Sequence, residues 1–162
     1  MGLGRLHASV WWQGKCGMRW HQLLPTIKTL LRYEDPPEWL VLHCGGNAIG
    51  QIPLKQLRAK MLNDVVFLRT SLPNTKLVWS QILPRLEWKA ELNHVALEKI
   101  RIRLNSMMAY DILSSGGGYI KYPEIRESEC IFLSYKVHLS HVGNDFFIHN
   151  FQLGSHSFLS SV

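Results

Sequence analysis

The chain has 162 residues, of which 46% are hydrophobic and 19% are charged, a composition typical of a folded protein that excludes a disordered one. This length predicts one domain over residues 1–162. Lys and Arg number 18 against 12 Asp and Glu, so the formal charge is +6. That excess favours contact with nucleic acid or another anionic surface, although the positive residues are scattered. No apolar run is long enough to span a membrane, which argues against a membrane partner.

The cysteines and the first residues indicate an intracellular protein. Cys16, Cys44 and Cys130 are odd in number and match no metal-binding spacing, so we expect reduced, mostly buried thiols in a cytoplasmic or nuclear protein. The start, MGLGRLHASVWWQGK, lacks the charged segment and apolar stretch of a secretory signal. None of the eight histidines falls at metal-ligand spacing with acids or cysteines. We therefore predict no metal and no cofactor.

Strand and helix patterns alternate from the first residues onward. Leu6–Gln13 is rich in β-forming residues and predicts a strand. Met18–Tyr33 is helical in pattern, with Pro25 either kinking the helix or marking its true first turn. A buried strand is expected over 39–43. The clearest helix covers Pro53–Leu72, where leucine, methionine and valine recur every three or four residues behind a proline.

The second half continues the alternation. We predict a strand over 74–83 and a long helix over 88–113 that ends before three glycines. Residues 118–123 and 130–135 are short strand candidates, and 146–160 is expected to form a closing helix. The connections are too long for hairpins. The sequence therefore predicts an α/β fold, a three-layer α/β/α sandwich with a mainly parallel sheet.

Three loops are expected at the ligand-binding edge of this sheet, because ligands bind beyond the carboxyl ends of parallel strands. These loops cover 14–17, 45–50 and 84–88, and the segment around His138 is expected near them. In the second loop, a buried strand ends on two glycines and Asn47. Two interpretations are open: a tight turn built from residues that tolerate positive φ, or a site where the amide of Asn47 donates to a reacting oxygen.

Three segments resemble motifs of the SGNH hydrolases, an esterase and lipase superfamily. WWQGKCGMRWHQLLP is similar to the glycine block, LVLHCGGNAIG to the block with a Gly-x-Asn-Asp core, and YKVHLSHVG to the Asp-x-x-His block. The resemblance implies a backbone donor at Gly14, with Gly17 as the alternative. It also implies an oxyanion-binding amide at Asn47 and a general base at His138, which would act on a small ester in the cleft.

The sequence departs from this family at the positions of the catalytic residues. The family nucleophile lies in a Gly-Asp-Ser turn ahead of the glycine block, but Ser9 is the only serine before Gly14. We expect the first strand and its nucleophile to be absent. Tyr135 stands at the position of the aspartate and is neutral at pH 7, so it cannot stabilise an imidazolium. Ala48 also replaces an aspartate. These departures predict an inactive or truncated esterase-like domain, acting on a small acyl or acetyl ester if active.

Each family position also has a structural interpretation. Gly14 and Asn47 suit plain turns, and His138 suits a loop before the last helix, where Ser140 is a reasonable N-cap. His43 and His141 are expected to be non-catalytic, with His43 hydrogen-bonding locally.

Four further features carry weaker expectations. Ser80 ends a strand, and a hydroxyl bonded to backbone is favoured over one that lines the cleft. Arg85 and Trp88 suit either a pocket wall or a surface ledge. Lys99–Arg103, KIRIR, favours a solvated helix face over a basic patch. The alternative function is a basic nucleic-acid-associated or scaffold module, since SGNH-like domains resemble parts of multi-domain polypeptides of mobile elements.

Overall fold

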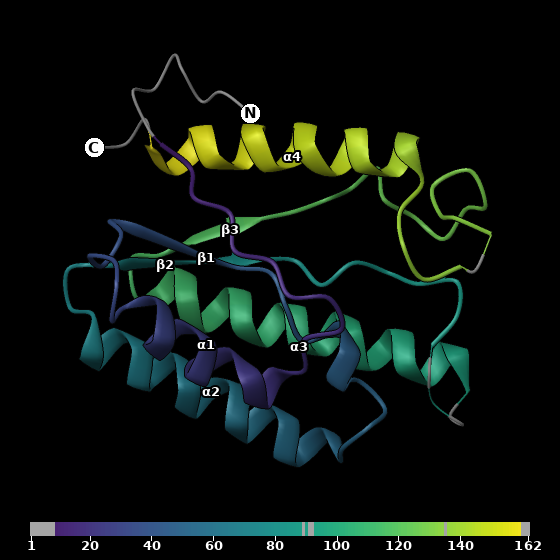
Figure 1. The fold of residues 1–162 in the computed structure, drawn as a ribbon. Coiled ribbons are helices and arrows are strands. Elements are labelled where there is room, and N and C mark those ends of the chain that lie inside the picture. The colour runs from purple at the N-terminus through teal and green to yellow at the C-terminus, as the bar shows by residue number, and fades with distance from the viewer. Residues whose placement is uncertain (1–8, 89, 91–92, 135, 160–162) are drawn as a thin grey trace.

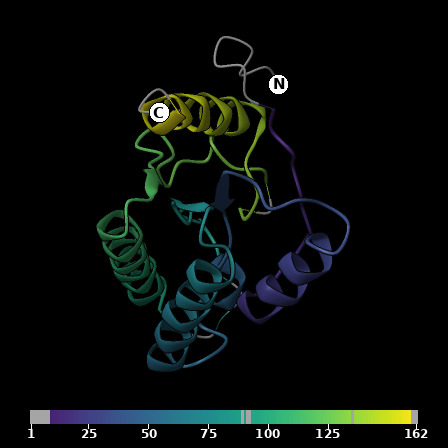
Figure 2. The ribbon, with the colours of Figure 1, turned by 90° about the vertical axis from the view of Figure 1, so that its left-hand side faces the viewer.

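A parallel sheet lies between two layers of helices (Figures 1 and 2). The computed structural model describes residues 9–88, 90, 93–134 and 136–159. Its three-stranded sheet has the order β1-β2-β3, formed by β1 (Trp39–Leu42), β2 (Lys76–Ser80) and β3 (Gly118–Ile120). Both pairings are parallel. The predicted three-layer α/β/α architecture with a mainly parallel sheet is confirmed.

The helices divide unequally between the two faces. One face carries α1 (Leu23–Leu30), α2 (Leu54–Ser71) and α3 (His94–Ser114), and the other carries α4 (His141–Leu159) (Figure 2). A 3-10 turn over Trp20–Gln22 precedes α1. No helix within the described ranges is both long and apolar enough to cross a membrane.

Two apolar cores follow from these layers. The larger core lies between the sheet and α1, α2 and α3, and includes the fully buried side chains of Trp20, Met61 and Trp79. The smaller core lies between the sheet and α4, where Phe151 and Phe158 pack. Burial on both faces explains why β1 and β2 are almost entirely apolar.

Local signals explain the helix ends. Asn93 caps α3, because its Oδ1 accepts a hydrogen bond from the Val95 amide at 2.8 Å. Ser140 does the same before α4, accepting from the Gly143 amide at 3.2 Å, as predicted. Pro25 lies in the first turn of α1, so the second interpretation of that proline is correct.

Two predicted strands are wrong. Residues 9–13 are not a strand and are exposed, and 6–8 lie outside the described residues. The cause is a missing neighbour, since no backbone hydrogen bond joins residues 9–13 to any other described segment. Residues 130–134 form turns and one isolated antiparallel bridge between Phe132 and Leu139, so the chain folds back on itself there instead of joining the sheet.

The long helix also differs from its prediction. It begins at His94, because Asn93 caps it there. Arg101 is only 7% exposed, so the prediction of a solvated face over 99–103 is wrong at this residue. Its guanidinium is compensated by Glu98, at 2.8 Å from Nε to Oε2, and donates to the Ile82 carbonyl at 2.8 Å. Likewise α4 begins at His141, five residues before the predicted start at 146.

A buried amide fixes the chain where β2 ends. Asn105 Oδ1 accepts from Trp79 Nε1 at 3.1 Å and from the Ile82 amide at 2.8 Å, and its Nδ2 donates to the Ile82 carbonyl at 3.0 Å. Asn105 is 3% exposed, so no bulk water can replace these bonds. This side chain therefore holds the start of the loop that leads to Arg85.

Replacement of Asn105 should destabilise the fold. Asn105→Leu leaves the Ile82 amide and the Trp79 indole without their buried acceptor, and we expect a loss of about 3 kcal/mol in the free energy of unfolding. Urea denaturation followed by circular dichroism measures this loss. Ser106→Ala, on the exposed side of the same helix, is the control and should change stability by less than about 0.5 kcal/mol. Equal effects of the two substitutions would contradict the anchoring role.

Candidate functional site

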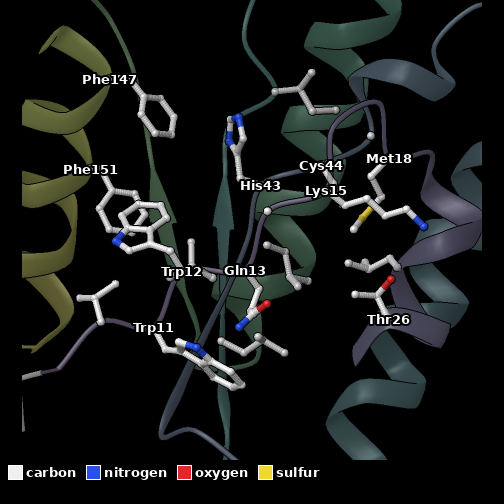
Figure 3. A pocket seen from close by; sticks show the side chains of 18 of the residues that line it. Trp11, Trp12, Gln13, Lys15, Met18, Thr26, His43, Cys44, Phe147 and Phe151 are labelled. Atoms are coloured by element: carbon white, nitrogen blue, oxygen red, sulfur yellow. The ribbon is translucent and has the colours of Figure 1, made fainter. Parts of the chain in front are cut away.

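A cavity of about 1250 Å³ opens beside β1 (Figure 3). Its walls are residues 9–15, β1, α1 and α4. Figure 3 shows Phe147 and Phe151 of α4 on the left, Thr26 of α1 on the right, and the segment with Trp11, Trp12 and Gln13 crossing between them. Because both helical layers contribute apolar side chains, most of the wall is hydrophobic. Polar side chains lie at both ends, with Asn47 and Arg85 where β1 ends and three carboxylates where β1 begins.

The segments that carry the family resemblance converge on this cavity. Gly14, Asn47 and His138 all line it. Gly17 is not among the residues of the wall, and its φ of +67° indicates a turn that requires glycine. Tyr135 lies outside the described residues. The structure thus brings three predicted site residues to one cavity, while their chemical roles stay predictions.

Asn47 connects two loops. Its Nδ2 donates to the Met18 carbonyl at 3.1 Å, and its Oδ1 accepts from the Arg85 guanidinium at 2.9 Å. The positive φ of the turn, +109°, belongs to Gly45 and not to Asn47. A Cβ on Gly46 would lie 3.0 Å from Arg85, so this glycine allows the guanidinium to approach. The second amide hydrogen of Asn47 takes no part in the Met18 bond.

Arg85 places a positive charge at the same end of the cavity. Its guanidinium carbon lies 5.2 Å from the ring centre of Trp88, and the side chain lines the cavity. Burial lowers the pKa of Arg85 from its ordinary value, but a guanidinium stays charged in proteins. Within the described part of the chain, no ion pair joins Arg85 to a carboxylate. The prediction of a pocket wall is thus confirmed for Arg85, whereas Trp88 is not among the residues that line the cavity.

A buried hydroxyl network lies next to Asn47. His43 Nδ1 and Ser80 Oγ are 2.8 Å apart, and Ser80 Oγ is 2.6 Å from the Tyr122 hydroxyl. Phe147 stacks on Tyr122 with ring centres 4.8 Å apart. Ser80 is 0% exposed. The prediction that Ser80 bonds to backbone is thus wrong, because both of its partners are side chains, and burial also removes it from the cavity wall.

The environment of His43 disfavours its charged form. His43 lines the cavity and keeps an exposed surface there, yet Ser80, Tyr122 and Phe147 lie against its ring. The pKa of His43 is lowered to about 4, chiefly by this burial and also by the charge of Arg85, while the bond with Ser80 opposes both effects. Burial also raises the pKa of Tyr122, opposed by its bond with Ser80. At pH 7 His43 is consequently neutral and a weak base.

The cysteines differ in part from their prediction. All three are free, but Cys16 and Cys130 are exposed, so the expectation of mostly buried thiols is wrong. Cys44, directly after His43, is partly buried, and burial with the nearby charge of Asp64 raises its pKa to about 12. Cys44 is thus a poor nucleophile. In the described residues no group of three His, Cys, Asp or Glu side chains is placed to hold a metal ion.

Sequence reasoning missed the pairing of His43 with Ser80. A signal was available, since His43 directly follows one strand and Ser80 ends the next. Carboxyl ends of neighbouring parallel strands meet at one edge of a sheet. Only the register, with Leu42 opposite Trp79, shows that the two side chains are neighbours.

Comparison with known proteins shows the fold alone. No family model matches the chain, and no curated protein is similar to it in sequence. The structure is similar to the crystal structure of a candidate acylhydrolase from Bacteroides fragilis, with a TM-score of 0.72 and 15% sequence identity. The match covers 88% of this chain and 72% of that one. The chain therefore has an acylhydrolase-like α/β fold.

The low pKa of His43 makes stability depend on pH. The pKa is about 4 in the folded chain and 6.5 as the reference for an unfolded one, so protons bind preferentially to the unfolded chain between these values. Stability is then constant above about pH 6.5 and falls as the pH decreases toward about 4. NMR titration of the His43 ring measures the pKa directly. In Arg85→Met the pKa of His43 should rise, because a nearby positive charge is removed.

His43→Gln is the matching control for this prediction. It should remove the part of the stability change between about pH 6.5 and about pH 4 that His43 causes. A His43 ring that titrates near 6.5 in the intact chain would contradict the effect of burial and of Arg85.

Proposed function

We propose that this chain is a divergent SGNH-type esterase-like domain that binds a small acyl or acetyl ester beside β1 and does not hydrolyse it efficiently. The observation that carries this proposal is that Gly14, Asn47 and His138 line one cavity. We place the domain inside the cell, in keeping with its free cysteines.

The donors around Asn47 support the binding part of the proposal. Asn47 is held between Met18 and Arg85, so its amide has a fixed orientation. The guanidinium beside it adds a positive potential in a partly enclosed cavity. Such donors stabilise a developing oxyanion by about 3 kcal/mol each when they are correctly placed. A carbonyl oxygen with its partial negative charge suits this end of the cavity.

The serines of the described chain support the lack of efficient hydrolysis. Ser9 and Ser155 line the cavity, and Ser80 is fully buried. Ser155 is buried in α4 and donates to the Phe151 carbonyl at 2.7 Å. Its hydroxyl proton is therefore held by the helix backbone. Loss of the nucleophile in a serine hydrolase costs on the order of a million-fold in turnover.

Hydrolysis of p-nitrophenyl acetate tests this proposal. We expect the intact chain and His138→Ala to give the same rate, within about twofold of buffer alone, because Ser80, which bonds to His43, is fully buried and cannot reach an ester. The same ester should shift the NMR signals of the Asn47 side-chain amide in a saturable way. A hydrolysis rate well above that of buffer and dependent on His138 would contradict the proposal that the domain is inactive. NMR signals of the Asn47 amide that do not shift with the ester would contradict ester binding.

A second proposal, nucleic-acid association, rests on the formal charge of +6. A filter-binding titration with single-stranded and double-stranded DNA and RNA tests it. If about six phosphates are contacted, affinity should fall by about a thousandfold between about 50 mM and about 200 mM salt. Absence of binding at the lower salt concentration would remove this function.

A further inference from the structure

One side of β1 has no backbone partner in the described chain. The sheet order β1-β2-β3 leaves β1 at an edge. The Glu38 carbonyl accepts a hydrogen bond from the Lys76 amide at 2.8 Å, so the backbone groups of Glu38 are directed toward β2. Backbone groups of a strand alternate in direction, which directs those of Leu40 toward β2 and those of Trp39 and Val41 toward the open side. That open side faces the cavity and not the outside of the molecule.

Residues 9–13 form the opposite wall of this cavity (Figures 1 and 3). The segment has a β-forming composition, with Val10, Trp11 and Trp12 in succession, but makes no strand pairing. Trp12 lies against Phe151 of α4, with ring centres 4.8 Å apart. The cavity is therefore a slot with backbone on two sides and a helical layer on each of its faces. We refer to it below as the β1 slot.

Both faces of the β1 slot are apolar. Leu23, Ile27 and Leu31 lie on the α1 side. Phe147, Phe151 and Phe158 lie on the α4 side. An occupant needs apolar groups on both faces and also donors and acceptors for the backbone of Trp39 and Val41. A lipid chain offers the first property alone, whereas an extended peptide offers both, since its side chains alternate between faces.

Charges at the two ends of the slot indicate a direction. Glu34, Asp35 and Glu38 line it where β1 begins, and Lys15 and Arg85 line it where β1 ends. A peptide that runs in the direction of β1, with a basic residue first and an acidic residue last, pairs opposite charges at both ends. The reverse order would place like charges together, which costs affinity.

We propose that the β1 slot binds an extended strand of a partner polypeptide that adds to the sheet parallel to β1. The partner segment is apolar over about four residues, matching the four residues of β1, with a basic residue before it and an acidic residue after it. Main-chain hydrogen bonds to Trp39 and Val41 hold it on one side, and residues 9–13 pair with it on the other. This site requires neither Asn47 nor His138, so it stands independently of ester binding.

A synthetic peptide tests the proposal. Lys-Lys-Val-Leu-Ile-Val-Asp-Asp is titrated into the isotope-labelled chain, and amide hydrogen exchange is followed by NMR. At saturation the amides of Trp39 and Val41 should exchange at least about tenfold more slowly, because each gains a hydrogen bond. The amide of Leu40, directed toward β2, is the internal reference and should change much less.

Two control peptides separate strand pairing from general adhesion. In Asp-Asp-Val-Leu-Ile-Val-Lys-Lys the charges are exchanged, and we expect affinity at least about fivefold lower at low salt, with a smaller difference at high salt. A peptide with Pro in place of Ile lacks a central donor and should bind at least about tenfold more weakly.

In the variant Glu34→Lys/Glu38→Lys, at two exposed positions, the preference between the two charge orders should decrease or reverse.

Several results would overturn the proposal. These are no saturable binding, binding without slower exchange at Trp39 and Val41, and equal affinity for both charge orders at low salt. Sedimentation of the peptide-free chain as a dimer in which those two amides are already slow would assign the slot to a second copy instead. Ester binding, measured separately at the Asn47 amide, can fail while the peptide binds, so the two proposals are distinguishable.

Discussion

The register of β1 on β2 is the constraint on which the site depends. With Leu42 opposite Trp79, both strands end at one rim, and His43 meets Ser80 immediately beyond the paired residues. The loops that leave the two strands are then neighbours, which allows Asn47 to bond to Arg85. A shift by one residue would move every side chain of β1 to the opposite face and separate these groups. Apolar burial on both faces thus fixes the geometry of the polar rim.

The polar side chains of this rim stabilise the structure and also line the cavity. Asn47 uses its oxygen and one hydrogen to join two loops, and His43 satisfies a hydroxyl that is fully buried. Because His43 is neutral at pH 7, the positive charge at this rim comes from Arg85 and Lys15. An anion or a polarised carbonyl oxygen therefore meets Arg85 and the Asn47 amide first. Binding and hydrolysis are separable here, since Ser80, which bonds to His43, is fully buried and does not line the cavity.

The sequence predicts most of the layers, because apolar periodicity reports burial directly. The strand at 39–42 and the helix at 54–71 follow from it within a residue or two. Periodicity fails where polar groups are buried with partners distant in sequence. The charge of Arg101 predicts a solvent-exposed side chain, yet the guanidinium is buried and donates to the Ile82 carbonyl, because Glu98 compensates its charge. The prediction of a strand before Gln13 fails for another reason: composition favours an extended chain but does not supply the neighbour that a strand needs.

The unpaired segment 9–13 and the open side of β1 are two parts of one structural feature. Both line the same cavity, and the apolar residues of α1 and α4 lie on its other walls. A strand added there would be buried on both faces, as parallel strands generally are. If it runs parallel to β1, the first residue after its apolar part reaches the rim where Asn47 and Arg85 lie. The chemistry available at this rim would then depend on a residue that the partner strand contributes. The β-forming composition of residues 9–13 would be explained by their pairing with the same strand.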